Sequence, residues 1–158
     1  MEFVAIDFET TGYEHGADNR PWQLGAARVV EGQIVETREW FFGPDGGSAA
    51  GWPTVAVGAP SLMEQWPEFH DFLKDVRLVA HNISTERTIL TRIAPLTRWG
   101  PWEDTLKLAK VRYPRLPSYA LGDLCTMFGL VPQFAERSWH DGLFDAVACA
   151  RLAVFLGG

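Results

Sequence analysis

Two acidic side chains, Asp7 and Glu9, interrupt an apolar run over residues 4–9. Side chains alternate across a strand, so the pattern predicts that Ile6 and Phe8 enter a core. Asp7 and Glu9 would then lie side by side on the opposite face. Adjacent carboxylates repel in a low dielectric, and either a raised pKa or a bound divalent cation relieves the repulsion. The pair therefore indicates a metal site. The plain alternative is a solvent-facing strand with two ordinary carboxylates.

Further polar residues occur where helices are expected to begin. Glu86 falls in the first turns of a helix expected over 83–93. The dipole of that helix would favour a glutamate near its start even if the side chain had no other role. His140 lies in a loop before a helix expected over 143–155, and Asp145 lies in that helix. Residues five apart do not share one helical face, but a loop-to-helix junction would let both side chains reach a common site. A simple capping role is the alternative for His140.

The elements that must position these residues follow from periodicity and from turn signals. Strands are expected over 2–9, 22–30, 33–42, 77–80 and 99–104. Helices are expected over 61–74, 83–93, 105–111, 119–128 and 143–155, with Ser61 as an N-cap. The segment 43–60 is rich in Gly, Pro, Ala and Ser and is expected to be a loop that is either flexible or covers a substrate. Strands that first follow one another and then alternate with helices predict an α/β protein, with a mixed five-stranded sheet flanked by helices.

Length and composition limit the classes of protein that fit. With 158 residues, 47% of them hydrophobic, the chain is expected to form a single domain over 1–158. A net charge of -6 argues against coating nucleic acid through a broad basic surface, although a strand end could still be held through cations. No apolar run is long enough to cross a membrane, and no basic leader precedes one. We therefore expect a cytoplasmic protein with reduced cysteines and no membrane contact.

Three motifs together resemble those of one enzyme family. Residues 7–12, Asp-Phe-Glu-Thr-Thr-Gly, match D-x-E-T-T-G, and residues 80–82, Ala-His-Asn, match the opening of a second motif. His140 with Asp145 matches a third, H-x-x-x-x-D. In this combination the chain resembles the DEDDh 3′-to-5′ exonucleases, the proofreading-subunit-like group with an RNase H-like fold. The resemblance covers nearly the whole chain.

The resemblance implies a reaction and a set of roles. The reaction is hydrolysis of phosphodiester bonds at the 3′ end of single-stranded nucleic acid, with DNA favoured, releasing nucleoside 5′-monophosphates. Asp7, Glu9, Glu86 and Asp145 would be the ligands of two divalent cations, Mg²⁺ or Mn²⁺, which prefer hard oxygen ligands. His140 would take the proton from the attacking water, because histidine titrates near neutral pH.

The resemblance also implies a substrate-binding segment, and it has two departures. Thr10, Thr11 and Gly12 would hold the 3′-terminal nucleotide, although the same residues could simply form the turn after a strand. Glu86 replaces the usual Asp of the second motif, and its extra methylene would shift the carboxylate at the second cation. Gly142 replaces a common Ala in the third motif and is expected to loosen the loop that presents His140.

Two other functions fit the same residues. One is an RNA-trimming or oligoribonucleotide exonuclease with the same site, which the sequence does not distinguish because the 2′-hydroxyl leaves no signature in it. The other is a non-catalytic nucleic-acid-binding or adaptor domain, which only the Glu86 departure favours. No protein partner is indicated, and association with a polymerase has no support in the sequence.

Overall fold

The computed structural model describes residues 1–12, 19–46, 49 and 51–157. The strands are β1 (Glu2–Thr10), β2 (Pro21–Val30), β3 (Gln33–Phe41), β4 (Arg77–Ala80) and β5 (Trp102–Asp104). The helices are α1 (Thr54–Val57), α2 (Leu62–Leu73), α3 (Ser84–Ile93), α4 (Thr105–Arg112), α5 (Leu121–Phe128) and α6 (Gly142–Phe155).

The described strands form one mixed sheet in the order β3-β2-β1-β4-β5. β1, β2 and β3 are antiparallel neighbours, whereas β4 and β5 run parallel to β1. Glu31 and Gly32 form the tight turn between β2 and β3, both with positive φ. The prediction of an α/β protein with a mixed five-stranded sheet flanked by helices is confirmed.

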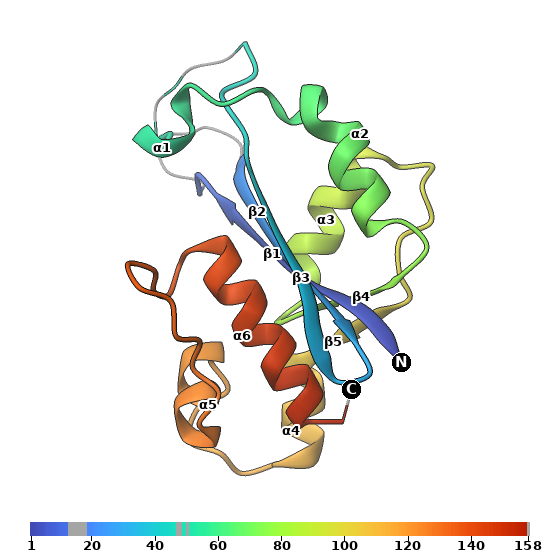
Figure 1. The fold of residues 1–158 in the computed structure, drawn as a ribbon, viewed down its shortest axis with the longest axis vertical. Coiled ribbons are helices and arrows are strands. Elements are labelled where there is room, and N and C mark those ends of the chain that lie inside the picture. The colour runs from blue at the N-terminus through green and yellow to red at the C-terminus, as the bar shows by residue number, and fades with distance from the viewer. Residues whose placement is uncertain (13–18, 47–48, 50, 158) are drawn as a thin grey trace.

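The central strand β1 is buried on both faces. Val4, Ile6 and Phe8 face a core formed with α2 and α3, as the alternation predicted. Phe3 and Ala5, on the other face, pack against α6. Figure 1 shows α6 covering one side of the sheet while α2 and α3 lie on the other. Asp7 and Glu9 continue the row that faces α6, so the acidic pair lies where β1 meets this helix.

Several element boundaries differ from expectation. The strand expected over 99–104 is confined to Trp102–Asp104, because Gly100 has a φ of 92° and Pro101 has no N–H for the ladder. The expected loop over 43–60 contains the short helix α1, in which Ala56 is buried; residues 47, 48 and 50 of that loop lie outside the described residues. α2 begins as expected, with Ser61 and Glu64 forming a reciprocal capping box.

The helix expected from residue 119 begins instead at Leu121. Tyr119 lies in the connection that precedes the helix, where its hydroxyl accepts the N–H of Leu116 at 3.2 Å. No helix within the described ranges is long and apolar enough to cross a membrane.

The start of α6 lies directly against β2. A Cβ added to Gly25 would lie 2.1 Å from the carbonyl oxygen of Gly142. Real side chains do not approach backbone that closely, so this contact requires a glycine on the strand. The close approach sets the distance between α6 and the sheet, and with it the distance between Asp145 and β1.

Gly25→Ala should lower the free energy of unfolding by at least about 2 kcal/mol, because the added methyl group forces α6 away from β2. Urea denaturation measures this change. Gly58→Ala is the matched control, since an added Cβ there meets nothing within 4 Å. We expect the control to stay within about 0.5 kcal/mol of the parent protein. Equal stability of the two variants would contradict the close contact.

Candidate active site

Three carboxylates from two distant parts of the chain meet at the junction of β1 and α6. Asp7 and Glu9 come from the carboxyl-terminal half of β1, and Asp145 comes from the first turn of α6. One carboxylate oxygen from each lies within 4.8 Å of the others. The structure therefore brings together three of the four ligands predicted from the sequence, although Asp7 and Asp145 are 138 positions apart in the chain.

Burial dominates the electrostatics of this carboxylate cluster. It raises the pKa of Asp7 well above its usual range, and the charges of the neighbouring carboxylates raise that pKa further. Burial, followed by the charge of Glu9, raises the pKa of Asp145 to about 7. The pKa of Glu9 is also raised, mainly by burial. The cluster thus resists ionisation unless positive charge is supplied.

The chemistry of the cluster fits a hard divalent cation. Asp7 Oδ2 and Asp145 Oδ1 are buried, and neither accepts a hydrogen bond from any described residue. Buried polar atoms are nearly always paired, so orphaned carboxylate oxygens that converge on one point are notable. Carboxylate oxygens are the ligands that Mg²⁺, Mn²⁺ and Ca²⁺ prefer. A bound cation would satisfy both the orphaned atoms and the repulsion.

Glu86 lies beside this cluster but outside the group of three. Its side chain is only 4% exposed although it occupies the first turn of α3. Oε1 accepts the backbone N–H of Phe8 on β1 at 3.3 Å, and burial raises the pKa of Glu86 to about 7. Its charge also raises the pKa of Asp7. A glutamate placed there only for the helix dipole would be solvated, whereas this one is turned inward against the active strand.

His140 occupies the exposed loop just before α6, as predicted from its spacing to Asp145. It has a φ of 71°, and its backbone N–H donates to Asp145 Oδ2 at 3.3 Å. Its ring is close enough for an electrostatic effect that lowers the pKa of Glu9. The adjacent Asp141 caps α6 by accepting the N–H of Phe144 at 3.0 Å.

A polar clamp that the sequence analysis missed holds this loop to the sheet. Arg137 forms a two-pronged pair with Glu39 of β3, at 2.8 and 2.7 Å, and also bonds Asp141 at 3.2 Å. Gln23 of β2, which is fully buried, donates to Glu39 at 3.4 Å and accepts the N–H of Gly142 at 2.9 Å. The detectable signal was a glutamine in the apolar first part of a strand, residues 21–27, since a buried amide must have partners.

The expectation that Gly142 loosens the loop before α6 is wrong. Gly142 is buried and its N–H is held by Gln23. A Cβ at this position would lie 3.1 Å from Gln23 Cδ and 3.2 Å from Gly25 N. The missing side chain therefore permits tight packing of the helix start against β2, and the loop gains no freedom from it.

The segment predicted to bind the terminal nucleotide comprises the last residue of β1 and the two residues that follow it. The N–H of Thr11 donates to the carbonyl of Arg20 at 2.8 Å, and the N–H of Gly12 donates to Asn19 Oδ1 at 2.8 Å. Gly12 has a φ of 77°, which favours glycine. These amides already have partners within the chain. Thr10 is the last residue of β1, and residues 13–18 lie outside the described residues.

Known proteins resemble this chain in sequence. No protein-family model matches it. The PolC-type DNA polymerase III of Halalkalibacterium halodurans is 32% identical over 162 residues, which cover 96% of this chain. The PolC-type DNA polymerase III of Thermotoga maritima is 31% identical over 155 residues, which cover 91% of it. The chain spans 11% of the length of each of these relatives.

Solved structures resemble the chain in fold. Exonuclease X in complex with 5′-overhanging duplex DNA superposes with a TM-score of 0.72 at 24% identity, covering 98% of this chain and 90% of that one. E. coli exonuclease I in complex with a dT13 oligonucleotide gives a TM-score of 0.74 at 18% identity, covering 98% and 40%. The fold is therefore RNase H-like. The three motifs, the sequence relatives and this fold agree with the resemblance to the DEDD exonucleases of the RNase H-like superfamily.

Proposed function

We propose that this chain is a metal-dependent 3′-to-5′ exonuclease that acts on single-stranded nucleic acid ends, DNA above all. The observation that carries the proposal is the convergence of Asp7, Glu9 and Asp145 within 4.8 Å, with His140 at the rim. Carboxylates that only cap helices or face solvent do not need to converge on one point. A site that binds cations and cleaves a phosphodiester does.

The residues suited to hold two divalent cations, Mg²⁺ or Mn²⁺, are Asp7, Glu9, Asp145 and Glu86. The orphaned oxygens of Asp7 and Asp145 support direct ligation. Glu86 faces β1 from α3 and lies close enough to influence Asp7, which suits a ligand of the second cation, with or without an intervening water. When bound, such cations stabilise the negative charge that develops on the attacking and leaving oxygens.

The remaining roles belong to the chain's own groups. His140 would accept a proton from the attacking water, since its exposed ring can reach solvent at the edge of the carboxylate cluster. The new bond joins the water oxygen to phosphorus, and the bond to the penultimate O3′ breaks. The terminal residue leaves as a nucleoside 5′-monophosphate, and the departing O3′ takes a proton from solvent, so that the shortened strand ends in a 3′-hydroxyl. Thr10, Thr11 and Gly12 would contact that terminal nucleotide through groups other than the amides already engaged.

The relatives support DNA as the substrate. The similar curated proteins are DNA polymerases, and both solved structures above hold DNA. The similarity to these polymerases is compatible with a proofreading partnership between this chain and a polymerase. The chain spans 11% of their length. Shortening of RNA in preference to DNA would instead support the trimming enzyme. Binding without turnover would support the adaptor domain.

Asp7→Ala should abolish hydrolysis, because it removes the carboxylate that lies centrally in the cluster. A 5′-labelled ladder assay on matched single-stranded DNA and RNA, with Mg²⁺, Mn²⁺ or EDTA, measures this loss. We expect shortening from the 3′ end only with metal and only in the parent protein. The Asp7→Ala protein should unfold at the same or a higher temperature, since the substitution removes repulsion. Retained activity in a purified, metal-loaded Asp7→Ala sample would refute the site.

Glu86→Asp should keep or raise the Mg²⁺-supported rate. The shorter side chain withdraws from the N–H of Phe8 and restores the residue type usual in the second motif. The ladder assay with Mg²⁺ and Mn²⁺ compared at equal concentration tests this expectation. A fall of tenfold or more with both metals would mean that this site requires the longer side chain of a glutamate at position 86.

In EDTA, the free energy of unfolding should fall as the pH rises from about 5 to 7.5. Burial raises the pKa of Glu86 from 4.5 to about 7, so over this range the folded state holds a proton that the unfolded state has lost. Stability is therefore greater on the acid side and declines until the folded pKa is passed. The contribution of Glu86 is on the order of 2 kcal/mol. Mn²⁺ or Mg²⁺ at pH 7.5 should restore stability.

Urea denaturation across this pH range measures the decline, and Glu86→Gln is the control. A neutral amide loses no proton, so its curve should be shallower than that of the parent protein. Parallel curves would contradict the raised pKa. A parent protein that neither cation stabilises at pH 7.5 would contradict metal binding by the cluster.

A further inference from the structure

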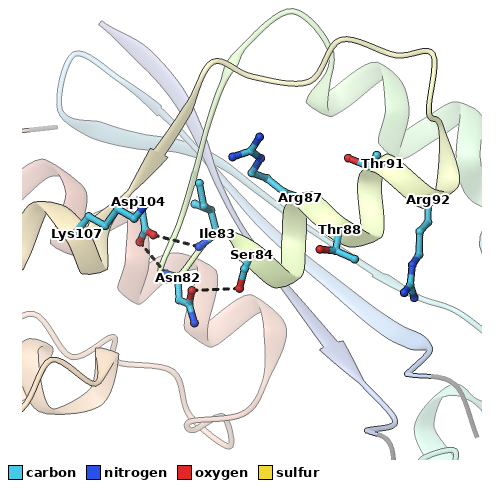
Figure 2. A pocket seen from close by; sticks show the side chains of 9 residues that line it. All are labelled: Asn82, Ile83, Ser84, Arg87, Thr88, Thr91, Arg92, Asp104 and Lys107. Carbon is cyan, nitrogen blue, oxygen red and sulfur yellow. Dashed lines mark hydrogen bonds between the residues drawn. The ribbon is translucent and has the colours of Figure 1, made fainter.

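An open groove of about 540 Å³ runs along the outer face of α3 to the start of α4. Its lining residues come from the β4–α3 connection and from both helices: Asn82, Ile83, Ser84, Arg87, Thr88, Thr91, Arg92, Asp104 and Lys107. Figure 2 shows the α3 side chains following one another along the helix. Asp104 and Lys107 lie beyond the start of this helix, near Ile83. Three cations and three hydroxyl-bearing side chains thus share one surface.

The cations of this groove belong to a strongly biased segment. Residues 87–115 carry seven of the fourteen Lys and Arg residues and only two of the twenty acidic residues. A chain with a net charge of -6 therefore concentrates half its positive charge in less than a fifth of its length. Such segregation makes a local attractive field for an anion on a molecule that repels polyanions elsewhere.

The positive charges in the groove are unpaired within the described part of the chain. No described carboxylate lies within ion-pair distance of the charged groups of Arg87, Arg92 or Lys107, although other surface cations such as Arg38 and Lys74 are paired. All three are exposed.

The one carboxylate that lines the groove is already occupied. Asp104 accepts backbone N–H groups from Asn82 at 2.9 Å, Ile83 at 3.4 Å and Leu106 at 3.0 Å. Its charge is therefore turned toward the β4–α3 connection and the start of α4. The guanidinium and ammonium groups of the groove remain available to a ligand.

The groove leads toward the end of β1, the strand that carries Asp7 and Glu9. A second hollow of about 190 Å³ shares Ser84, Thr88 and Arg92 with it and extends to Asn19. The side chain of Asn19 holds the N–H of Gly12, just past the end of β1. Glu86, on the inner face of the same helix, touches β1. Ser84 to Arg92 spans about 12 Å of helix, so an extended ligand could pass from Asn19 to Lys107 without leaving this surface.

We propose that the outer face of α3, from Asn19 to Lys107, binds the phosphodiester backbone of the nucleic acid whose 3′ end is being cleaved. This proposal rests on the exonuclease function proposed above and names where the rest of that substrate lies. Guanidinium, ammonium and hydroxyl donors are the groups that hold phosphates without reading sequence. The phosphates come from the cleaved strand or from its complement at a recessed end.

The test compares Arg87→Gln/Arg92→Gln with a matched control, Arg38→Gln/Lys74→Gln, which changes the net charge equally but lies outside the groove. Substrates are a nitrophenyl ester of thymidine 5′-monophosphate, which has no upstream phosphate, a dT15 strand and a duplex with a recessed 3′ end. Measured quantities are kcat/KM for each substrate and the dependence of KM on salt concentration. Lys107→Gln tests the far end of the groove alone.

We expect the groove variant to cleave the ester within twofold of the parent protein and to lose tenfold or more on a longer substrate. Its slope of log KM against log salt on dT15 should fall by about 1.4, since each lost phosphate contact removes about 0.7. Loss on dT15 identifies the cleaved strand as the occupant, and loss confined to the duplex identifies the complement. The control should match the parent protein on all three substrates.

Two failures are distinguishable. If the parent protein cleaves neither the ester nor either DNA substrate, the proposed exonuclease function itself is wrong. A parent protein that cleaves all three, with the groove variant equal to the control on dT15 and on the duplex, overturns the groove proposal and leaves the exonuclease intact. Because the ester reports on the active site alone, it also shows that the groove variant is folded.

Discussion

Repulsion among the carboxylates at the β1–α6 junction is the constraint on which the rest of this structure depends. At an effective dielectric of about 20, two full charges separated by 4.8 Å repel by about 3.5 kcal/mol, which is several times thermal energy. Glu86 adds a fourth acid to the same neighbourhood. Burial raises the pKa values of these groups, which favours their neutral forms and so limits this cost. Positive charge brought to the cluster would relieve the repulsion directly.

A cluster that repels itself must be held by packing and by interactions outside it. On the β1 side, the apolar residues that flank Asp7 are buried in cores on both faces of the sheet. On the α6 side, the contact of Gly25 with Gly142 fixes the helix against β2, and Gln23 closes the same junction with a hydrogen bond. Arg137 then joins the loop to β3. The site is therefore preorganised by the sheet, while its own members oppose assembly.

What could be predicted from the sequence was local. Alternation placed Asp7 and Glu9 on one face of a strand, and the spacing of His140 to Asp145 required a loop-to-helix junction; both features follow from backbone geometry within a few residues. The partners of Gln23 and Arg137 lie on other strands and loops, so no local pattern reveals them. The inward turn of Glu86 depends on how α3 packs on β1. The backbone amides of Thr11 and Gly12 belong to the first motif, but they donate hydrogen bonds to other residues of the chain.

The overall charge illustrates the same limit. A net charge of -6 argues against a protein that coats nucleic acid, because a sum over the whole chain describes its average surface. The net charge does not describe how charges are distributed over the surface. A phosphodiester that approaches this molecule experiences the local field first. An acidic body with cations gathered on the outer face of α3 would disfavour polyanions in most orientations and admit them along one. For an enzyme that must engage only strand ends, such a charge distribution would contribute to selectivity as well as to affinity.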